Sequence, residues 1–272
     1  MEVFEAIILG VVQGVTEFLP ISSSGHLILA RELFGIGGEG GLAFDAILHF
    51  ATALAVLIYF WRDILDLVQN AVSWVLRRPV NQSKVHMLIA IGVATIPAVL
   101  LGLLLEGYLE TTFRSPLLVV FSLVTGSLII WGAEWMYRKR EVLVDENAPS
   151  SKNAVLIGLF QSLALIPGMS RSGMAISGGM FLGLSREGAT RFAFLLAIPL
   201  LLGAGAKKIL ELSESGALFV DFMALAAGAA SAFVVGFLVI HYLLKFVRTH
   251  SLMVFVWYRL ALAGLVLVFF LL

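Results

Sequence analysis

Long apolar segments dominate this sequence and constrain its fold more than any other feature. A transmembrane helix needs about 20 mostly apolar residues. Six segments come close to or exceed this length, namely Phe44–Phe60, Met87–Leu105, Leu117–Tyr137, Thr190–Ala206, Ala217–Leu244 and Leu252–Leu272. Charged residues make up only 13% of the chain, against roughly 25% in a soluble domain. The sequence therefore predicts an all-α polytopic membrane protein, with residues 1–272 forming a single membrane domain.

Two further apolar stretches are interrupted, and neither half of each is long enough to cross a bilayer. The first covers residues 3–34 and is broken at Pro20 and a following run of serines. The second covers residues 154–184 and is broken at Pro167 and Gly168. Proline removes a backbone donor and glycine loosens a helix, so the chain is expected to turn at both breaks. We interpret both stretches as re-entrant helix–turn–helix hairpins, which need protein or water around their broken backbone.

The two broken stretches belong to an internal repeat, which we assign to residues 1–140 and 152–272. A shift of 148 residues aligns them without a gap. The identical pairs are Gly10 with Gly158, Gln13 with Gln161, Ser22 with Ser170, Ser24 with Ser172, Gly25 with Gly173 and Gly35 with Gly183. Because an odd number of spans follows each hairpin, the second unit enters from the opposite face, as in an inverted-topology repeat. The two turns should meet near the midplane, where helix N-termini favour an anion.

The basic residues between the predicted spans indicate the orientation of the chain. Twelve lysines and arginines fall on one side and four on the other, so the first side is expected to be cytoplasmic. Both termini and the opening of the first hairpin then lie outside. Glu2 and Glu5 stand where a signal peptide would be basic, so we expect the first segment to remain in the mature protein.

Charge balance and the absence of cysteine exclude several functional classes. The chain has 18 basic and 18 acidic residues and a formal net charge of zero. A nucleic-acid-binding protein would show a basic face, so no nucleic-acid partner is expected. No cysteine is present, which excludes disulfides and thiolate metal sites. The expected partners are therefore membrane lipids and the ligand of the site described next.

Charged side chains on the two turns are the strongest functional candidates. Glu17 lies deep in an apolar run, on the same helix face as Gln13, and an intramembrane carboxylate is costly. The alternative is a structural glutamate bonded to backbone. Arg171 needs an anionic partner, and the surrounding Ser170, Ser172 and glycines favour a phosphate over a carboxylate. The alternative is an ion pair with Glu17, which a substrate could displace.

A serine run and a histidine follow the first break. Ser22, Ser23 and Ser24 could supply helix caps, but one or two hydroxyls would suffice for that. His26 suits general acid–base chemistry or, less often, attack on phosphorus, with a satisfied interior histidine as the alternative. Together the two turns offer what phosphoryl transfer needs, which is positioning and charge neutralisation. A divalent cation would find only one nearby carboxylate, that of Glu17.

Four polar residues within or near other spans receive a structural interpretation. Asp45 and His49 are four residues apart near the start of the first span, and Glu134 and Arg259 lie in later spans. Arg259 could be a second phosphate contact. We favour instead a pairing with Glu134 or with a backbone carbonyl.

Three motifs resemble those of a known family. They are QGVTEFLP at Gln13–Pro20, SSSGH at Ser22–His26 and PGMSRSG at Pro167–Gly173. They resemble the bacitracin-resistance family of undecaprenyl-diphosphate phosphatases, and the resemblance extends to FWR at Phe60–Arg62 and YR at Tyr258–Arg259. It implies removal of one phosphate from a polyprenyl diphosphate lipid, which recycles the carrier of cell-wall synthesis. It also implies a multi-pass plasma-membrane enzyme that depends on Mg²⁺ or Ca²⁺ and opens outward.

The resemblance also implies roles for individual residues. Expected catalytic residues are Glu17, Ser23, His26 and Arg171, with Ser23 as nucleophile and Glu17 also as metal ligand. Expected substrate-binding residues are Gln13, Ser22, Ser24, Ser170 and Ser172. Two positions depart from the family pattern, since Gln13 replaces an acidic residue and Ala175 replaces a threonine.

Two other functional classes compete with a phosphatase. Broken helices in an inverted repeat are also a transporter architecture, so a lipid-phosphate flippase is the alternative function. The grouping of serine, histidine and glutamate exceeds what anion binding requires, which favours the enzyme. A purely structural scaffold gives no reason for Arg171 and Glu17 to lie in the membrane. A homodimer is compatible with the sequence.

Overall fold

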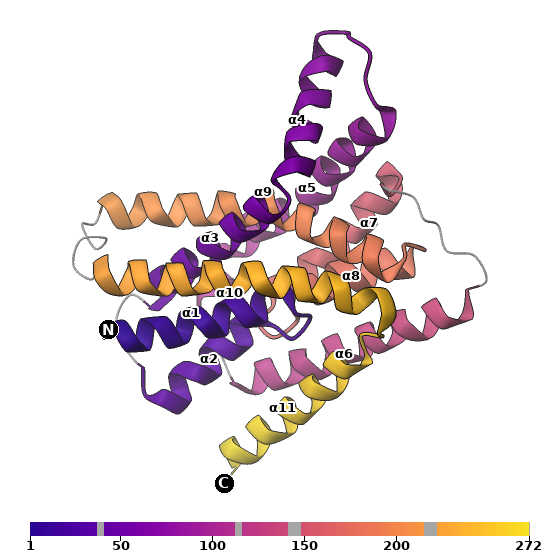
Figure 1. Ribbon diagram of the computed structural model, residues 1–272. Coiled ribbons are helices and arrows are strands. Elements are labelled where there is room, and N and C mark those ends of the chain that lie inside the picture. The colour runs from indigo at the N-terminus through magenta and orange to yellow at the C-terminus, as the bar shows by residue number, and fades with distance from the viewer. Residues whose placement is uncertain (37–40, 112–115, 141–147, 215–221, 272) are drawn as a thin grey trace.

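The computed structural model describes residues 1–36, 41–111, 116–140, 148–214 and 222–271, and its regular elements are helices (Figure 1). The α-helices are α1 (Val3–Phe18), α2 (Ser23–Phe34), α3 (Gly41–Tyr59), α4 (Trp61–Val75), α5 (Gln82–Thr111), α6 (Pro116–Lys139), α7 (Ser151–Ser162), α8 (Arg171–Phe181), α9 (Arg186–Glu214), α10 (Phe222–Thr249) and α11 (Met253–Leu271). A short 3-10 helix, η1 (Leu163–Leu165), continues α7. The all-α prediction is confirmed for the described part of the chain.

Several helices are long and apolar enough to cross a membrane. Four qualify singly, within α5, α6, α9 and α10, and the pair α3 and α4 qualifies together but is bent by 76°. The apolar part of α11, Met253–Phe269, falls below the length required of a span. The predicted span limits Ala217 and Leu272 lie outside the described residues. The protein is thus a multi-pass membrane protein, and its described residues contain four or five spans by length and composition where six were predicted.

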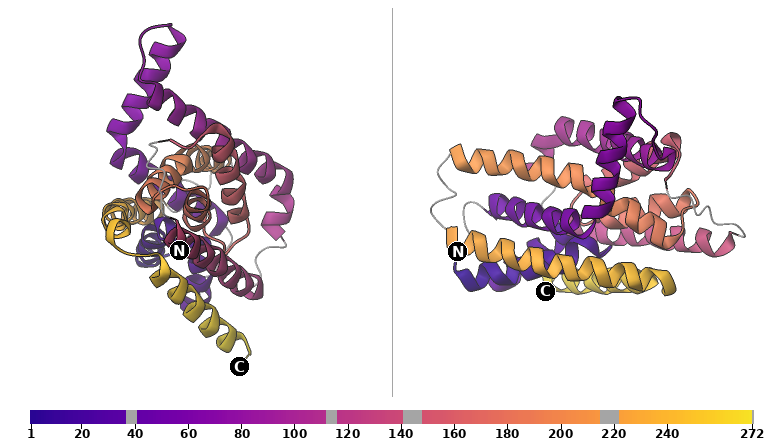
Figure 2. Two further views of the ribbon diagram at one scale, coloured as in Figure 1. Left: turned by 90° about the vertical axis from the view of Figure 1, so that its right-hand side faces the viewer. Right: turned by 45° about the horizontal axis from the view of Figure 1, so that its top comes forward.

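Helix α4 lies outside every predicted span. It follows α3 directly and projects from the bundle together with the start of α5 (Figure 2). Exposed apolar side chains at Trp61, Leu65, Val68 and Val72 recur every three or four residues, which is the pattern of an amphipathic helix. A search for long apolar runs misses such a helix because polar residues interrupt the run.

Both predicted breaks separate two helices, and the two turns share an unusual backbone conformation. Ser22 has φ 77° and Ser170 has φ 76°, values uncommon for residues other than glycine. Each serine caps the helix that follows, because Ser22 Oγ accepts from the N–H of Gly25 (3.3 Å) and Ser170 Oγ from the N–H of Gly173 (3.1 Å). These positions are 148 residues apart, which is the shift that aligns the two broken stretches of the sequence.

Glycines let the first helix of each pair pack closely on a long helix. A Cβ at Gly10 would overlap the carbonyl of Gly228 on α10, and a Cβ at Gly158 would overlap the carbonyl of Ala94 on α5. Small residues at such contacts are typical of helix packing in membranes. The short helix α8 is enclosed by the bundle, since every residue from Ser172 to Met180 is buried. Protein therefore surrounds this broken segment, as such a backbone requires.

Candidate active site

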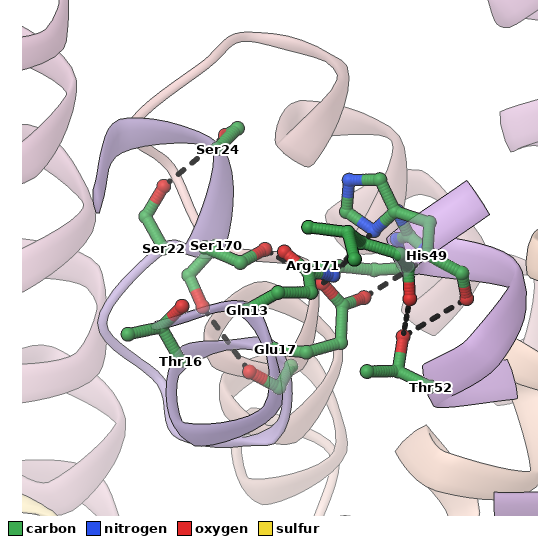
Figure 3. A network of polar contacts seen from close by, with 12 residues as sticks. Gln13, Thr16, Glu17, Ser22, Ser24, His49, Thr52, Ser170 and Arg171 are labelled. Carbon is green, nitrogen blue, oxygen red and sulfur yellow. Dashed lines mark hydrogen bonds and ion pairs between the residues drawn. The ribbon is translucent and has the colours of Figure 1, made fainter. Parts of the chain in front are cut away.

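The two turns contact each other inside the bundle. Ser172 Oγ, at the start of α8, donates to the carbonyl oxygen of Leu19 at the end of α1 (3.0 Å). Beside this contact is a small cavity of about 120 Å³, lined by residues of both turns and by one residue of α3. The lining residues are Glu17, Ser22, Ser23, Ser24, His49, Ala164, Leu165, Pro167, Ser170 and Arg171. Figure 3 shows the polar network around this cavity.

Glu17 is the best-connected residue of the network. Its side chain is 4% exposed. Its Oε2 accepts a hydrogen bond from Ser23 Oγ (2.6 Å) and another from Gln13 Nε2 (2.9 Å), and it lies 3.1 Å from His49 Nδ1. The bond from Ser23 has the length of a charge-assisted O–H···O⁻ contact. The Ser23 hydroxyl therefore has a proton acceptor in place.

Arg171 is the first residue of α8 and faces the same cavity. Its Nη1 lies 3.6 Å from Glu17 Oε1, an ion pair longer than a hydrogen bond. The Arg171 side chain is 29% exposed, so part of the guanidinium remains accessible. The ion pair with Glu17, one of the two interpretations made from the sequence, is thus observed, and a phosphate contact of Arg171 stays a prediction.

The remaining serines of the two turns surround the cavity or support it. Ser22 Oγ and Ser24 Oγ lie 3.4 Å apart, and Ser170 Oγ and Ser172 Oγ lie 3.2 Å apart. Ser22, Ser24 and Ser170 line the cavity, while Ser172 holds the other turn through Leu19. Capping accounts for one of the three serines of the first turn, where one or two were expected, and for Ser170 in the second turn.

His26 does not join Glu17 and Arg171, which corrects the predicted grouping. Its Nδ1 lies 2.7 Å from the carbonyl oxygen of Ser22, and its Nε2 lies 2.8 Å from the hydroxyl of Tyr258. The ring is stacked on Tyr258 and lines an apolar cavity between α2 and α11. The cause is a partner on α11, 232 residues away, which motif spacing does not indicate.

Arg259 confirms the structural interpretation and clamps both turns. It is fully buried. Its Nη1 donates to the carbonyl oxygens of Pro20 and Met169 (both 3.2 Å), and its Nη2 donates to that of Gly168 (3.0 Å). Its Nε donates to Ser127 Oγ (3.2 Å). These bonds satisfy carbonyl groups that the helix breaks leave free, so Arg259 is committed to backbone and is not the second phosphate contact.

Of the other three residues that were given a structural interpretation, two make structural contacts and one belongs to the candidate site. Asp45 pairs with Arg31 (2.5 Å), and Glu134 makes a two-point ion pair with Arg186 (2.8 and 2.7 Å). Both are structural contacts, although Glu134 does not pair with Arg259. His49 instead lines the cavity and contacts Glu17. The sequence did contain a signal for His49 as a site residue, because an ionisable residue within an apolar span is a functional candidate for the same reason as Glu17.

Comparison with known proteins identifies the family. The family model described as bacitracin resistance protein BacA matches residues 6–265. This chain belongs to the BacA family. The undecaprenyl-diphosphatase of Moorella thermoacetica is 43% identical over 270 residues, which are 99% of this chain and 98% of that protein. The protein of the same name from Alteromonas mediterranea is 43% identical over 273 residues, 99% of each chain. The resemblance inferred from the motifs is confirmed.

The donor set of this BacA-family site suits a divalent cation only in part. Among the described residues, no group of three or more His, Cys, Asp or Glu side chains could hold a metal. The cavity has the Glu17 carboxylate, and behind it Gln13 Oε1 is buried without a hydrogen-bond partner in the described part of the chain. Both are oxygen ligands of the kind Mg²⁺ and Ca²⁺ prefer. A cation there would need further oxygens from substrate and water.

Proposed function

We propose that this protein hydrolyses undecaprenyl diphosphate to undecaprenyl phosphate and inorganic phosphate. The observation that carries the proposal is the hydrogen bond from Ser23 Oγ to the buried Glu17 carboxylate, in a cavity that Arg171 also faces. Full-length similarity to proteins named undecaprenyl-diphosphatase supports it.

The diphosphate would bind where the helices α2 and α8 begin. The first backbone N–H groups of a helix have no partner within it and attract anions. Arg171 adds a guanidinium whose fork matches phosphate oxygens. Substrate oxygens would compete with Glu17 for Arg171 across the present 3.6 Å contact. The isoprenoid tail would stay in the lipid between helices.

In the reaction, Ser23 Oγ would attack the terminal phosphorus while Glu17 takes the hydroxyl proton. The bond from that phosphorus to the bridging oxygen breaks, and undecaprenyl phosphate leaves. Glu17 passes the proton to the leaving phosphate, which restores its carboxylate. Water then attacks the phosphoserine while Glu17 takes one of its protons. The bond from phosphorus to Ser23 Oγ breaks, Glu17 returns the proton to Ser23 Oγ, and inorganic phosphate leaves. This assignment favours Ser23 over His26 as nucleophile, because His26 lies outside the cavity lining. Carboxylate bases of this kind contribute about 10²- to 10⁴-fold to a rate.

A divalent cation, Mg²⁺ or Ca²⁺, is part of the proposal. It would neutralise the charge of the diphosphate when bound. Glu17 and Gln13 Oε1, which has no hydrogen-bond partner among the described residues, would hold it, together with oxygens of the substrate.

For the membrane arrangement we propose six spans and two re-entrant hairpins in an inverted-topology repeat. The matching φ angles of Ser22 and Ser170 and the contact between the two turns support it. Both termini and the mouth of the site would face outward from the plasma membrane. A homodimer is compatible with this arrangement.

The test is phosphate release from undecaprenyl diphosphate by purified protein in detergent, with added Mg²⁺. Wild-type protein should be active, and Ser23→Ala should lose at least about 100-fold in kcat. Ser83→Ala, at the start of α5, is the matched control and should match wild type. Transport of lipid phosphate across vesicles with no phosphate released would replace this proposal by the flippase alternative.

A further inference from the structure

The proposed chemistry leaves His49 without a role, although it contacts the reacting carboxylate. His49 lies on α3, and its Nδ1 is 2.9 Å from Gln13 Nε2 and 3.1 Å from Glu17 Oε2. Gln13 Nε2 is in turn 2.9 Å from the same Glu17 oxygen. The three atoms form a closed triangle, and one of its corners, Glu17 Oε2, is the oxygen that accepts the Ser23 hydroxyl (Figure 3).

Burial makes each contact of this triangle important. Gln13 is fully buried and the Glu17 side chain is 4% exposed, while that of His49 is 24% exposed. A buried polar atom that loses its partner has little water to replace it. Removing the polar atom of His49 would therefore leave the Glu17–Gln13 pair incompletely bonded. The carboxylate could then rotate away from Ser23.

His49 can complete the triangle in either of two hydrogen arrangements. An amide nitrogen only donates, so Gln13 Nε2 donates to Nδ1 when that ring nitrogen is unprotonated. When Nδ1 carries a hydrogen, it donates to Glu17 Oε2. In the first case His49 orients Gln13, which binds Glu17, and in the second it binds Glu17 directly. Both arrangements fix the same carboxylate oxygen.

The corresponding positions of the second repeat lack the histidine and the carboxylate of this network. The shift of 148 residues places Leu165 at the position of Glu17, Ala197 at that of His49 and Gln161 at that of Gln13. Gln161 is buried, and neither its Nε2 nor its Oε1 has a hydrogen-bond partner among the described residues. The glutamine alone therefore makes no network. The histidine and the carboxylate occur together, in the repeat that carries Ser23.

We propose that His49 is a positioning residue that holds Glu17 Oε2 against the hydroxyl of Ser23. This inference rests on the proposed function, since it names a further residue of the same site. The positioning role requires a polar atom at the place of His49 Nδ1, but it requires neither a charge nor an imidazole ring. An asparagine can offer either an acceptor or a donor at that place, because its side-chain amide can flip by rotation about χ2.

Two variants of similar size test the proposal in the phosphate-release assay. His49→Leu removes the polar atom, and kcat should fall by about 10- to 100-fold, as expected for one hydrogen bond to a charged group. KM should stay within about threefold, because Arg171 and the helix N-termini bind the substrate. His49→Asn should recover kcat to within about threefold of wild type. His241→Leu, on α10, is the control for losing a histidine from this bundle.

Each outcome of this experiment supports or contradicts either the proposed function or the positioning role of His49. Inactive wild-type protein would defeat the proposed function itself. Active wild type with His49→Leu unimpaired would defeat only the positioning role. Equal loss in His49→Asn and His49→Leu, with both folded by thermal unfolding in detergent, would also overturn it. If His49→Leu does not fold, His49→Phe replaces it with the same expectations.

Discussion

The two hairpins, α1–α2 and α7–α8, share a backbone design but differ in their chemistry. Each has a serine near φ 77° that caps the following helix through a glycine N–H. The next residue, the first of the helix, is Ser23 in one hairpin and its repeat equivalent Arg171 in the other. One turn thus presents a hydroxyl and the other a cation at the same geometric position. Two turns of the same backbone conformation can therefore supply two helix N-termini while carrying different side chains.

The two hairpins also differ in burial. In α8 every residue from Ser172 to Met180 is buried, whereas α2 buries only four residues and ends with Phe34 61% exposed. Helix α8, from Ser172 onward, is therefore enclosed, and helix α2 lies nearer the edge of the bundle. This difference suits a site where the substrate enters beside α2.

The largest effect is expected from removing the cation of the second hairpin. Arg171→Ala should lower kcat about a thousandfold, because arginines that neutralise transferring phosphate contribute at least that much. Arg171→Lys keeps the charge without the fork and should recover part of the loss. Steady-state phosphate release measures both, with Arg248→Ala as control. Equal rates for Arg171→Ala and wild type would remove the chemical difference between the hairpins.

A somewhat smaller effect is expected from the carboxylate of the first hairpin. Glu17→Gln keeps the shape but removes the proton acceptor of Ser23, so kcat should fall about 10²- to 10³-fold. Because Glu17 and Ser23 act on one proton, the double variant Glu17→Gln/Ser23→Ala should be no slower than the slower single variant. Additive losses would instead mean that the two side chains act in separate steps.

The backbone similarity of the hairpins predicts matched losses of stability. Gly10→Ala and Gly158→Ala each place a Cβ against a carbonyl of a neighbouring helix, which should cost about 1–3 kcal/mol of unfolding free energy. Thermal unfolding in detergent measures this. Gly92→Ala is the control, since a Cβ there meets no atom within 4 Å. A loss at only one of the two glycines would break the equivalence of α1 and α7.

Features encoded locally could be predicted from the sequence, and features that depend on distant partners could not. Apolar length and the residues at Pro20 and Pro167 were enough to place most long helices and both breaks. The amphipathic helix α4 was not predicted, because its apolar residues are separated by polar ones and form no continuous run. The cavity position of His49 and the bond between His26 and Tyr258 depend on which helices pack together. No motif in a single sequence encodes that packing.

The smallest effect is expected at His26, whose repeat equivalent is Met174. His26→Met gives the first hairpin the residue of the second and removes the hydrogen bond to Tyr258. Because His26 does not line the cavity with Glu17, kcat should fall by no more than about tenfold, the value of one neutral hydrogen bond. Tyr258→Phe should cause a similar loss, and the double variant should add little, since both remove one bond. A loss from His26→Met as large as that from Arg171→Ala would show that His26 turns towards the phosphate during the reaction, and the specialisation of the first hairpin would then include it.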